Sequence, residues 1–256
     1  SVSEGRQFVF QANPTIPMRG RLMARFAAES LLMKSVGIIH ESADETARQI
    51  ASGFREEARQ IGLSVPYTLN LESRRDWSRL PGAFAGDSTV TDSMRAAAEA
   101  VYLPITGRDA QGKIQDAMVG LQRFGTDIRI LGNSQWHDLS VKQEASKVRA
   151  TYGNDFYIDT SRNGVQSFIR SYRMLTGETP DDLSVTAQRM AYTGHDVTRF
   201  LLQFVEAGRT RPSPDALRSP PRYNGLGIRI DFQPGSNVNR ALYFHRYRDG
   251  QIELIN

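Results

Sequence analysis

The fold of this chain is decided by residues 100–136, which read AVYLPITGRDAQGKIQDAMVGLQRFGTDIRILGNSQW. This segment begins with an apolar run at 100–105, which predicts a strand buried on both faces. Apolar side chains then recur at helical spacing between 110 and 121, which predicts an amphipathic helix that Thr106 can cap. Residues 128–132 predict the next strand. A strand–helix–strand unit of this kind is almost always right-handed, with parallel strands.

The loops that follow these two strands are the expected place for a binding site, because parallel α/β sheets bind ligands outside the carboxyl ends of their strands. The candidate residues are Thr106 and Gly107 in one loop and Asn133, Gln135 and Trp136 in the other. One flat aromatic ring with short hydrogen-bonding groups is typical of a small-molecule site. A ring at the rim of a crevice can stack on a ligand, and packing in the core explains Trp136 equally well.

The alternation of strands and helices extends to both sides of this segment. Ser42 with Glu45 forms a capping-box pattern that predicts the start of a helix, and Gly62 is expected to end that helix. After residue 160 the pattern changes to paired helices and then to a β tail in which Asp249-Gly250 predicts a hairpin. The order indicates an α/β fold with a parallel sheet and helices on both faces. Further strands are expected at 8–11, 35–40, 64–71, 155–159, 225–232 and 240–255.

Composition excludes several classes of function. With 256 residues, the chain is long enough for two packed domains or one large α/β unit. The absence of cysteine excludes thiol catalysis, thiolate metal sites and disulfides. The net charge of +4 comes from interspersed charges, without a basic helix or an aromatic and basic stripe, so the sequence does not indicate nucleic-acid binding. No apolar run approaches the roughly 18 residues of a membrane helix.

The sequence contains no convincing catalytic motif. Gly107 to Lys113 has the spacing G-x-x-x-x-G-K of a phosphate-binding loop, but Ile114 stands where a hydroxyl would hold magnesium. The four histidines lack the i, i+4 spacing of a helical metal site, and there is no G-x-S-x-G nucleophile motif. We therefore predict that the chain is not an enzyme and has no catalytic residues, no metal site and no cofactor.

Several segments resemble, in their order along the chain, the type I periplasmic solute-binding family, the branched-chain amino-acid binding proteins of ABC transporters. The helix at 191–202, with Tyr192 and Asp196, is similar to a helix of this family that contains the sequence Tyr-Asp-Ala. Proteins of this family have two lobes and often carry Tyr-Gly after the first strand of the second lobe, where this chain has Asp44-Glu45. A tyrosine that usually closes on the ligand is therefore absent. The other similar segments are 8–13, 35–62, 100–136 and 225–232.

The resemblance implies two lobes with parallel sheets flanked by helices, joined by crossovers. Residues 1–33 and 161–225 would form a partial lobe one, which lacks its N-terminal part, and residues 34–160 and 226–256 would form lobe two. The implied function is the solute-binding component of an ABC-type uptake system in the periplasm or cell envelope. Its partners would be a small polar solute such as an amino acid and a membrane permease, with no nucleic acid.

The alternative is a cell-envelope interaction module of the same fold, similar to the lipoprotein activators of penicillin-binding proteins, which needs no small solute. The two hypotheses differ in what they require of the crevice. A solute-binding protein should have polar, reachable side chains at 105–108 and 133–137, whereas an interaction module can have a filled crevice.

Overall fold

The computed structural model describes residues 3, 5–87, 89–123, 128–206, 212–219 and 222–256. The chain divides into two compact units. Unit 1 consists of Ser1–Thr15 and Asp155–Tyr243, and unit 2 consists of Ile16–Asn154 and Phe244–Asn256. Among the helices that the structure describes, none combines the length and the apolar character needed to cross a membrane.

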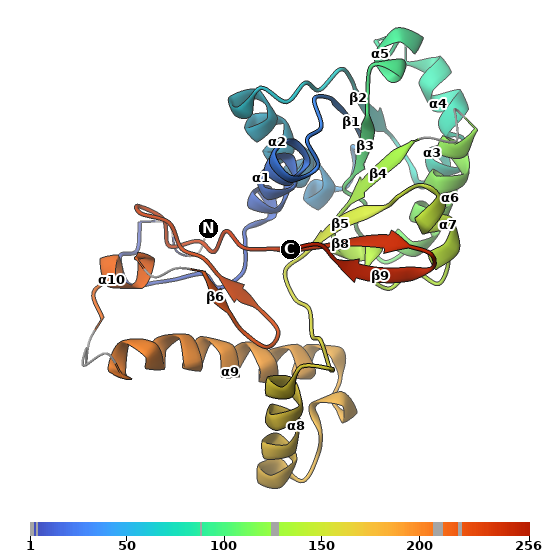
Figure 1. The fold of residues 1–256 in the computed structure, drawn as a ribbon. Coiled ribbons are helices and arrows are strands. Elements are labelled where there is room, and N and C mark those ends of the chain that lie inside the picture. Colours follow the sequence, from blue (N-terminus) through green and yellow to red (C-terminus); the bar gives the residue numbers. More distant parts are fainter. Residues whose placement is uncertain (1–2, 4, 88, 124–127, 207–211, 220–221) are drawn as a thin grey trace. The chain divides into compact units, whose positions relative to one another are not determined.

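Unit 2 is built on a seven-stranded sheet with the order β2-β1-β3-β4-β5-β8-β9 (Figure 1). The strands β1 to β5 pair in parallel, with β2 at one edge of the sheet. The antiparallel hairpin of β8 and β9 forms the opposite edge. The four parallel strands expected near 35–40, 64–71, 100–105 and 128–132 are therefore confirmed. The strands are β1 (Val36–Glu41), β2 (Thr68–Leu71), β3 (Ala100–Leu103), β4 (Arg129–Gly132), β5 (Thr151–Asn154), β8 (Tyr243–Arg248) and β9 (Gln251–Leu254).

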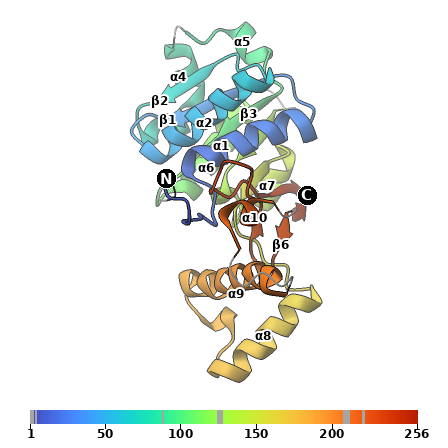
Figure 2. The same cartoon turned by 90° about the vertical axis from the view of Figure 1, so that its left-hand side faces the viewer.

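Helices cover both faces of this sheet (Figures 1 and 2). On one face α1 packs against α2, and on the other α3 and α4 pack against α6. The core on the α6 side contains Leu103, Ile114 and Trp136, all almost fully buried. The helical segments are α1 (Ile16–Arg25), the π-helical η1 (Phe26–Ser30), α2 (Glu45–Ile61), α3 (Arg74–Ser78), α4 (Leu80–Gly86), α5 (Asp92–Ala96), α6 (Ala110–Gln122), the 3-10 turn η2 (Ser134–Trp136) and α7 (Lys142–Lys147).

The caps of α2 differ in part from the expectation. Gly62 ends the helix with φ of 76°, as predicted. The N-cap is Asp44, whose carboxylate accepts the N–H of Ala47 at 3.0 Å, and not Ser42. Ser42 remains attached to the sheet, because its N–H and its hydroxyl both donate to the carbonyl of Leu71. The capping-box prediction is therefore wrong by two residues.

Unit 1 is mainly helical. It contains α8 (Asn163–Thr176), the 3-10 turn η3 (Pro180–Asp182), α9 (Val185–Glu206), α10 (Pro214–Arg218) and a two-stranded antiparallel sheet of β6 (Tyr223–Asn224) and β7 (Arg229–Ile230). Its apolar cluster consists of Phe200, Phe204, Ile228, Ile230 and Phe232. The strand expected at 8–11 is reduced to a single bridge from Gln11 to Val238. The strand expected at 155–159 is wrong, because the chain leaves the sheet after β5.

A buried carboxylate fixes the β6–β7 turn to α9. Asp196 is 0% exposed, and its oxygens accept the N–H groups of Leu226, Gly227 and Ile228 at 2.8, 2.8 and 3.0 Å. The backbone of Gly225 lies so close to this carboxylate that a side chain there would collide with it. Three charge-assisted hydrogen bonds thus hold the turn in one conformation.

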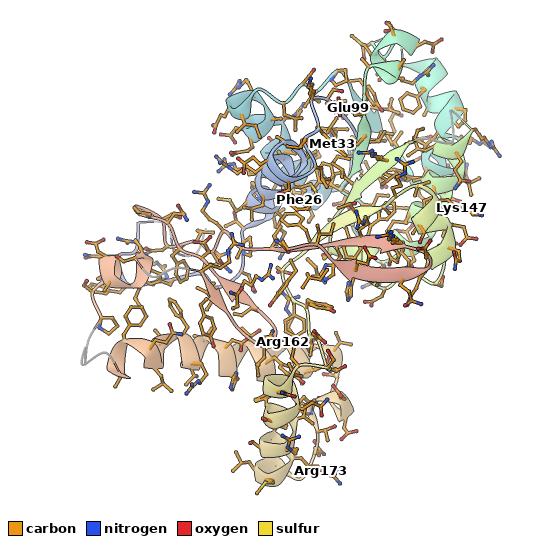
Figure 3. All side chains as sticks on the ribbon, viewed as in Figure 1. Phe26, Met33, Glu99, Lys147, Arg162 and Arg173 are labelled. Carbon is orange, nitrogen blue, oxygen red and sulfur yellow. The ribbon has the colours of Figure 1, made fainter. Side chains whose placement is uncertain are left out.

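The boundaries of the two compact units differ from those of the lobes expected from the sequence. Residues 16–33 belong to unit 2, because α1 packs on α2 and the ring of Phe26 (Figure 3) stacks on that of Phe244 in β8, with 3.8 Å between the ring centroids. Residues 226–243 belong to unit 1, because the side chain of Asn239 donates to the carbonyls of Ala12 and Arg229, both at 2.6 Å.

Candidate functional site

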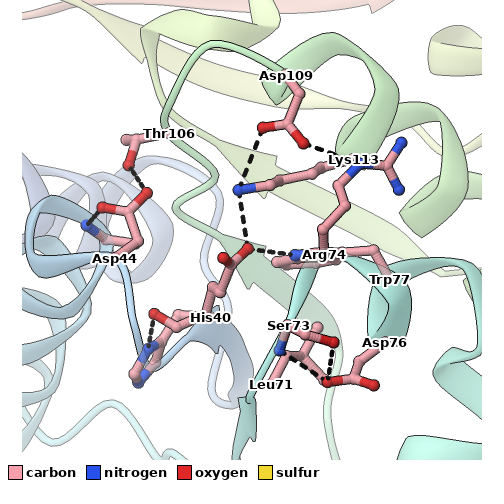
Figure 4. Close-up of polar contacts among 12 residues, drawn as sticks. His40, Asp44, Leu71, Ser73, Arg74, Asp76, Trp77, Thr106, Asp109 and Lys113 are labelled. Carbon is pink, nitrogen blue, oxygen red and sulfur yellow. Dashed lines mark hydrogen bonds and ion pairs between the residues drawn. The ribbon is translucent and has the colours of Figure 1, made fainter.

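The carboxyl ends of β1 to β4 meet at one edge of the unit 2 sheet, because these strands are parallel. Polar and charged side chains from several elements converge there (Figure 4). Glu41 ends β1, Thr106 follows β3, and Asn133 follows β4. This edge is where parallel α/β sheets place their ligands.

A buried ion pair lies at the centre of this edge. The ammonium of Lys113, in the first turns of α6, is 2.8 Å from Oε2 of Glu41, and the two side chains are 7% and 15% exposed. The indole N–H of Trp77 donates to the same carboxylate oxygen at 3.2 Å. Burial alone lowers the pKa of Lys113, but the hydrogen bond and charge of Glu41, together with Asp109, outweigh it, and the net effect raises this pKa. Lys113 is therefore a fixed cation that neutralises Glu41, and it is not aimed at a phosphate.

A second layer of charges surrounds this pair. Asp109 lies 3.5 Å from the ammonium of Lys113 and 2.9 Å from Nε of Arg74. Arg74 also pairs with Asp116 at 2.6 Å. The side chains of Arg74 and Asp109 are 43% and 52% exposed, so these outer contacts are screened by water. The charges of the cluster largely satisfy one another.

Thr106 connects the loops after β1 and β3. Its hydroxyl donates to one carboxylate oxygen of Asp44, while the other oxygen caps α2. Thr106 therefore does not cap α6, which begins after Asp109. Gly107 adopts φ of 97°, a conformation that favours glycine, and turns the chain toward the exposed Arg108.

Asn133 connects the loops after β3 and β4. Its amide donates to the carbonyl of Ile105 at 2.8 Å, and its Oδ1 is buried without a hydrogen-bond donor among the described residues. Ser134 is half-buried and Gln135 is exposed. A buried acceptor without a donor is rare in folded proteins and needs an explanation, such as a bound molecule.

Trp136 lies in the core and not at the rim. The 3-10 turn folds its ring against Gly132, and the indole is 0% exposed. Its carbonyl accepts the hydroxyl of Tyr247 at 2.6 Å, which fixes the turn. The indole therefore offers no free face to a solute, and the expectation that it stacks on a ligand is corrected. Of the five predicted residues, Thr106, Gly107 and Asn133 lie at this edge, and Gln135 is exposed on the loop after β4.

Sequence reasoning missed Glu41, Asp44, Arg74 and Lys113. Thr106 was predicted because it follows the carboxyl end of a parallel strand. Glu41 and Asp44 lie at the carboxyl end of β1, so the same argument could have predicted them. The contacts of Arg74 and Lys113 come from helices that pack over the edge, and no local pattern indicates them. Among the described residues, no group of three or more histidine, aspartate and glutamate side chains is arranged to hold a metal ion.

The fold of this chain is similar to the folds of several solved structures. No family model and no curated protein matches the chain. A leucine-binding protein, LivK, from Thermotoga maritima is 16% identical, with a TM-score of 0.58 over 100% of this chain and 69% of that one. A putative branched-chain amino acid ABC transporter protein from Rhodospirillum rubrum is 19% identical, with a TM-score of 0.63 over 96% and 67%. The C-domain of LpoA from Haemophilus influenzae, a regulator of PBP1A, is 12% identical, with a TM-score of 0.59 over 94% and 67%.

These likenesses show the fold. The chain has the α/β architecture of type I periplasmic binding proteins, with a mostly parallel central sheet flanked by helices. The three similar proteins are named as a leucine-binding protein, a branched-chain amino acid ABC transporter and a regulator of PBP1A.

Proposed function

We propose that the chain is the solute-binding component of an ABC-type uptake system and that it holds a small polar solute at the carboxyl edge of unit 2. The observation that carries this proposal is the set of polar side chains that remain reachable at this edge, namely the half-buried Thr106 and the exposed Arg108 and Gln135. They lie in the loops after β3 and β4, where a parallel α/β sheet places its ligand. The proposal implies a membrane permease as partner, a location in the periplasm or cell envelope, and no catalysis.

The chemistry of the edge favours a solute with charges of both signs. The carboxylate of Asp44, which accepts the Thr106 hydroxyl and caps α2, supplies a negative charge. The side chain of Arg108 is exposed and forms no ion pair with another described residue. Gln135 adds an exposed amide that can donate and accept. An amino acid carries a matching ammonium and carboxylate. Structures with a similar fold were solved with leucine and with isoleucine, which supports an amino acid as the first solute to test.

A thermal-shift screen of the protein against amino acids and small anions tests this function. A true ligand at a hundred times its dissociation constant should stabilise the protein by about 2.7 kcal/mol. Calorimetry with the best ligand should then show weaker binding for Thr106→Val and Gln135→Ala. The matched controls are Thr68→Val, at the first residue of β2, and Gln122→Ala, at the last residue of α6, and both lie away from the carboxyl edge. A screen without any stabilising solute, or equal losses in the controls, would contradict the proposal.

A second candidate is an envelope interaction module without a small solute. It is favoured by the apolar side chains that α8 and α9 expose in unit 1: Met174, Leu175, Val185 and Met190 are 86%, 86%, 81% and 69% exposed. Exposed apolar side chains of this size are typical of surfaces that a protein partner covers. The similarity to the LpoA C-domain suggests a penicillin-binding protein as the partner to test.

Interferometry with an immobilised penicillin-binding protein separates the two candidates. Saturable binding that Met174→Ser with Leu175→Ser abolishes, together with a negative solute screen, would favour the interaction module. A positive solute screen without partner binding would exclude it.

A further inference from the structure

A basic hollow lies between α7 and the β8–β9 hairpin of unit 2. Its volume is about 550 Å³, and its lining includes the cationic side chains of Lys147, Arg149, Arg246 and Arg248. Lys147 is the last residue of α7 (Figure 3). The N–H of Tyr247 donates to the carbonyl of Ala150 at 2.9 Å, which places the hollow where β5 begins. It is thus at the opposite end of the strands from the candidate solute site.

The walls of this hollow are held in place by hydrogen bonds. The N–H of Gly250, in the hairpin turn, donates to the hydroxyl of Ser146 at 3.0 Å, and that hydroxyl donates to the carbonyl of Lys142 at 2.9 Å. The amide of Gln143 lies against Gly250 so closely that a side chain there would collide with it. A pre-formed site binds its ligand with a smaller ordering cost.

Among the described residues, the cations that line the hollow outnumber the acids that pair with them. Glu253 pairs with Arg246 at 2.8 Å and lies 3.7 Å from Arg248, and Asp249, 3.8 Å from Arg248, is 93% exposed. Lys147 is exposed and forms no ion pair with another described residue. In the part of the chain that the structure describes, the cations Lys147, Arg246 and Arg248 therefore face two carboxylates, one of which extends into solvent. This excess attracts anions.

Arg149 occupies a backbone conformation that favours glycine. Its φ is 47°, in the left-handed region, just after the end of α7. A helix commonly ends on glycine at such a position, because a side chain is strained there. Strain of this kind is concentrated at functional sites, where the side chain serves a purpose that offsets it.

We propose that this hollow binds a small multivalent phosphate anion, such as a diphosphate or a phosphate ester. Guanidinium groups match phosphate oxygens with two parallel hydrogen bonds, and lysine adds a point charge. The hollow, with a volume of about 550 Å³, is large enough to admit such an anion. The phosphate group has two possible sources, a soluble phosphate ester or a phospholipid head group, and both present the same oxygens to the arginines.

Calorimetry with inorganic pyrophosphate tests this site. The double variant Lys147→Ala with Arg248→Ala should weaken binding about tenfold or more, from the usual strength of charge-assisted hydrogen bonds. The matched control, Lys34→Ala with Arg59→Ala, removes the same charge from exposed positions of unit 2 and should bind like the wild type. Absence of millimolar pyrophosphate binding by the wild type, or equal weakening in the control, would overturn the proposal.

Arg149→Gly separates binding from folding. Glycine tolerates the left-handed conformation, so this variant should keep or raise the melting temperature while it weakens pyrophosphate binding. Unchanged affinity in a folded Arg149→Gly protein would remove Arg149 from the site and overturn the argument from its strain.

Flotation with phosphatidylcholine vesicles that contain phosphatidylglycerol identifies the source of the phosphate group. Vesicle binding that pyrophosphate displaces and the double variant loses would support the site with a lipid head group as its ligand. Pyrophosphate binding without vesicle binding would support the site with a soluble phosphate ester.

Discussion

Replacement of Asp196 by alanine should destabilise unit 1 strongly. The carboxylate is fully buried and accepts three backbone N–H groups from residues 226–228. Hydrogen bonds to charged groups contribute about 1.5–3 kcal/mol each, so three bonds set an upper bound of about 4.5–9 kcal/mol. Relaxation of the turn and entry of water reduce this value, and we expect a loss of about 3–5 kcal/mol in the free energy of unfolding.

Asp196→Asn should cost less than Asp196→Ala. The amide oxygen can replace Oδ2, which accepts the N–H groups of Gly227 and Ile228, whereas the amide nitrogen would face the N–H of Leu226. We expect a loss of about 1–3 kcal/mol from the one unpaired donor.

Hydrogen exchange is the appropriate assay, because the chain has two compact units and global unfolding need not be two-state. The amides of residues 226–228 should exchange much faster in Asp196→Ala. Asp215→Ala serves as the control, because that side chain is 90% exposed and its pair with Arg218 should contribute little. Unchanged exchange at 226–228 in a folded Asp196→Ala protein would refute the reasoning.

Three further predictions concern unit 2. Glu41→Gln leaves the buried ammonium of Lys113 without its main partner and should lower the urea unfolding free energy by about 2–4 kcal/mol, whereas a variant of an exposed glutamate in α2 should be nearly neutral. Gly132→Ala forces a methyl group against the ring of Trp136 and should cost about 1–3 kcal/mol; a melting temperature equal to that of the wild type would contradict the close packing. Burial lowers the pKa of His137 below its ordinary value of 6.5, so the folded protein disfavours the proton and stability should fall as the pH drops below 6.5 toward the lowered pKa. Melting temperatures across this range should show a smaller decline in His137→Gln.

The geometry of the candidate site was predictable only in part. The location at the carboxyl edge follows from the strand order, and Asn133 in the loop after β4 bonds to Ile105, which precedes Thr106 in the loop after β3. The orientation of Trp136 did not follow, because it depends on the 3-10 turn and on the space above Gly132. The ion pair of Glu41 with Lys113 was also hidden, since the two residues are 72 positions apart and meet only when α6 packs over the sheet.

The sequence by itself determined the parallel sheet, the Gly62 cap and the Asp249-Gly250 hairpin. These features depend on local patterns, namely apolar periodicity and residues with special backbone conformations. Only the tertiary structure decided which unit contains residues 16–33, and where the charges of the edge find their partners. The physical reason is that burial and ion pairing depend on contacts between segments distant in sequence, and side-chain spacing within one segment does not specify them.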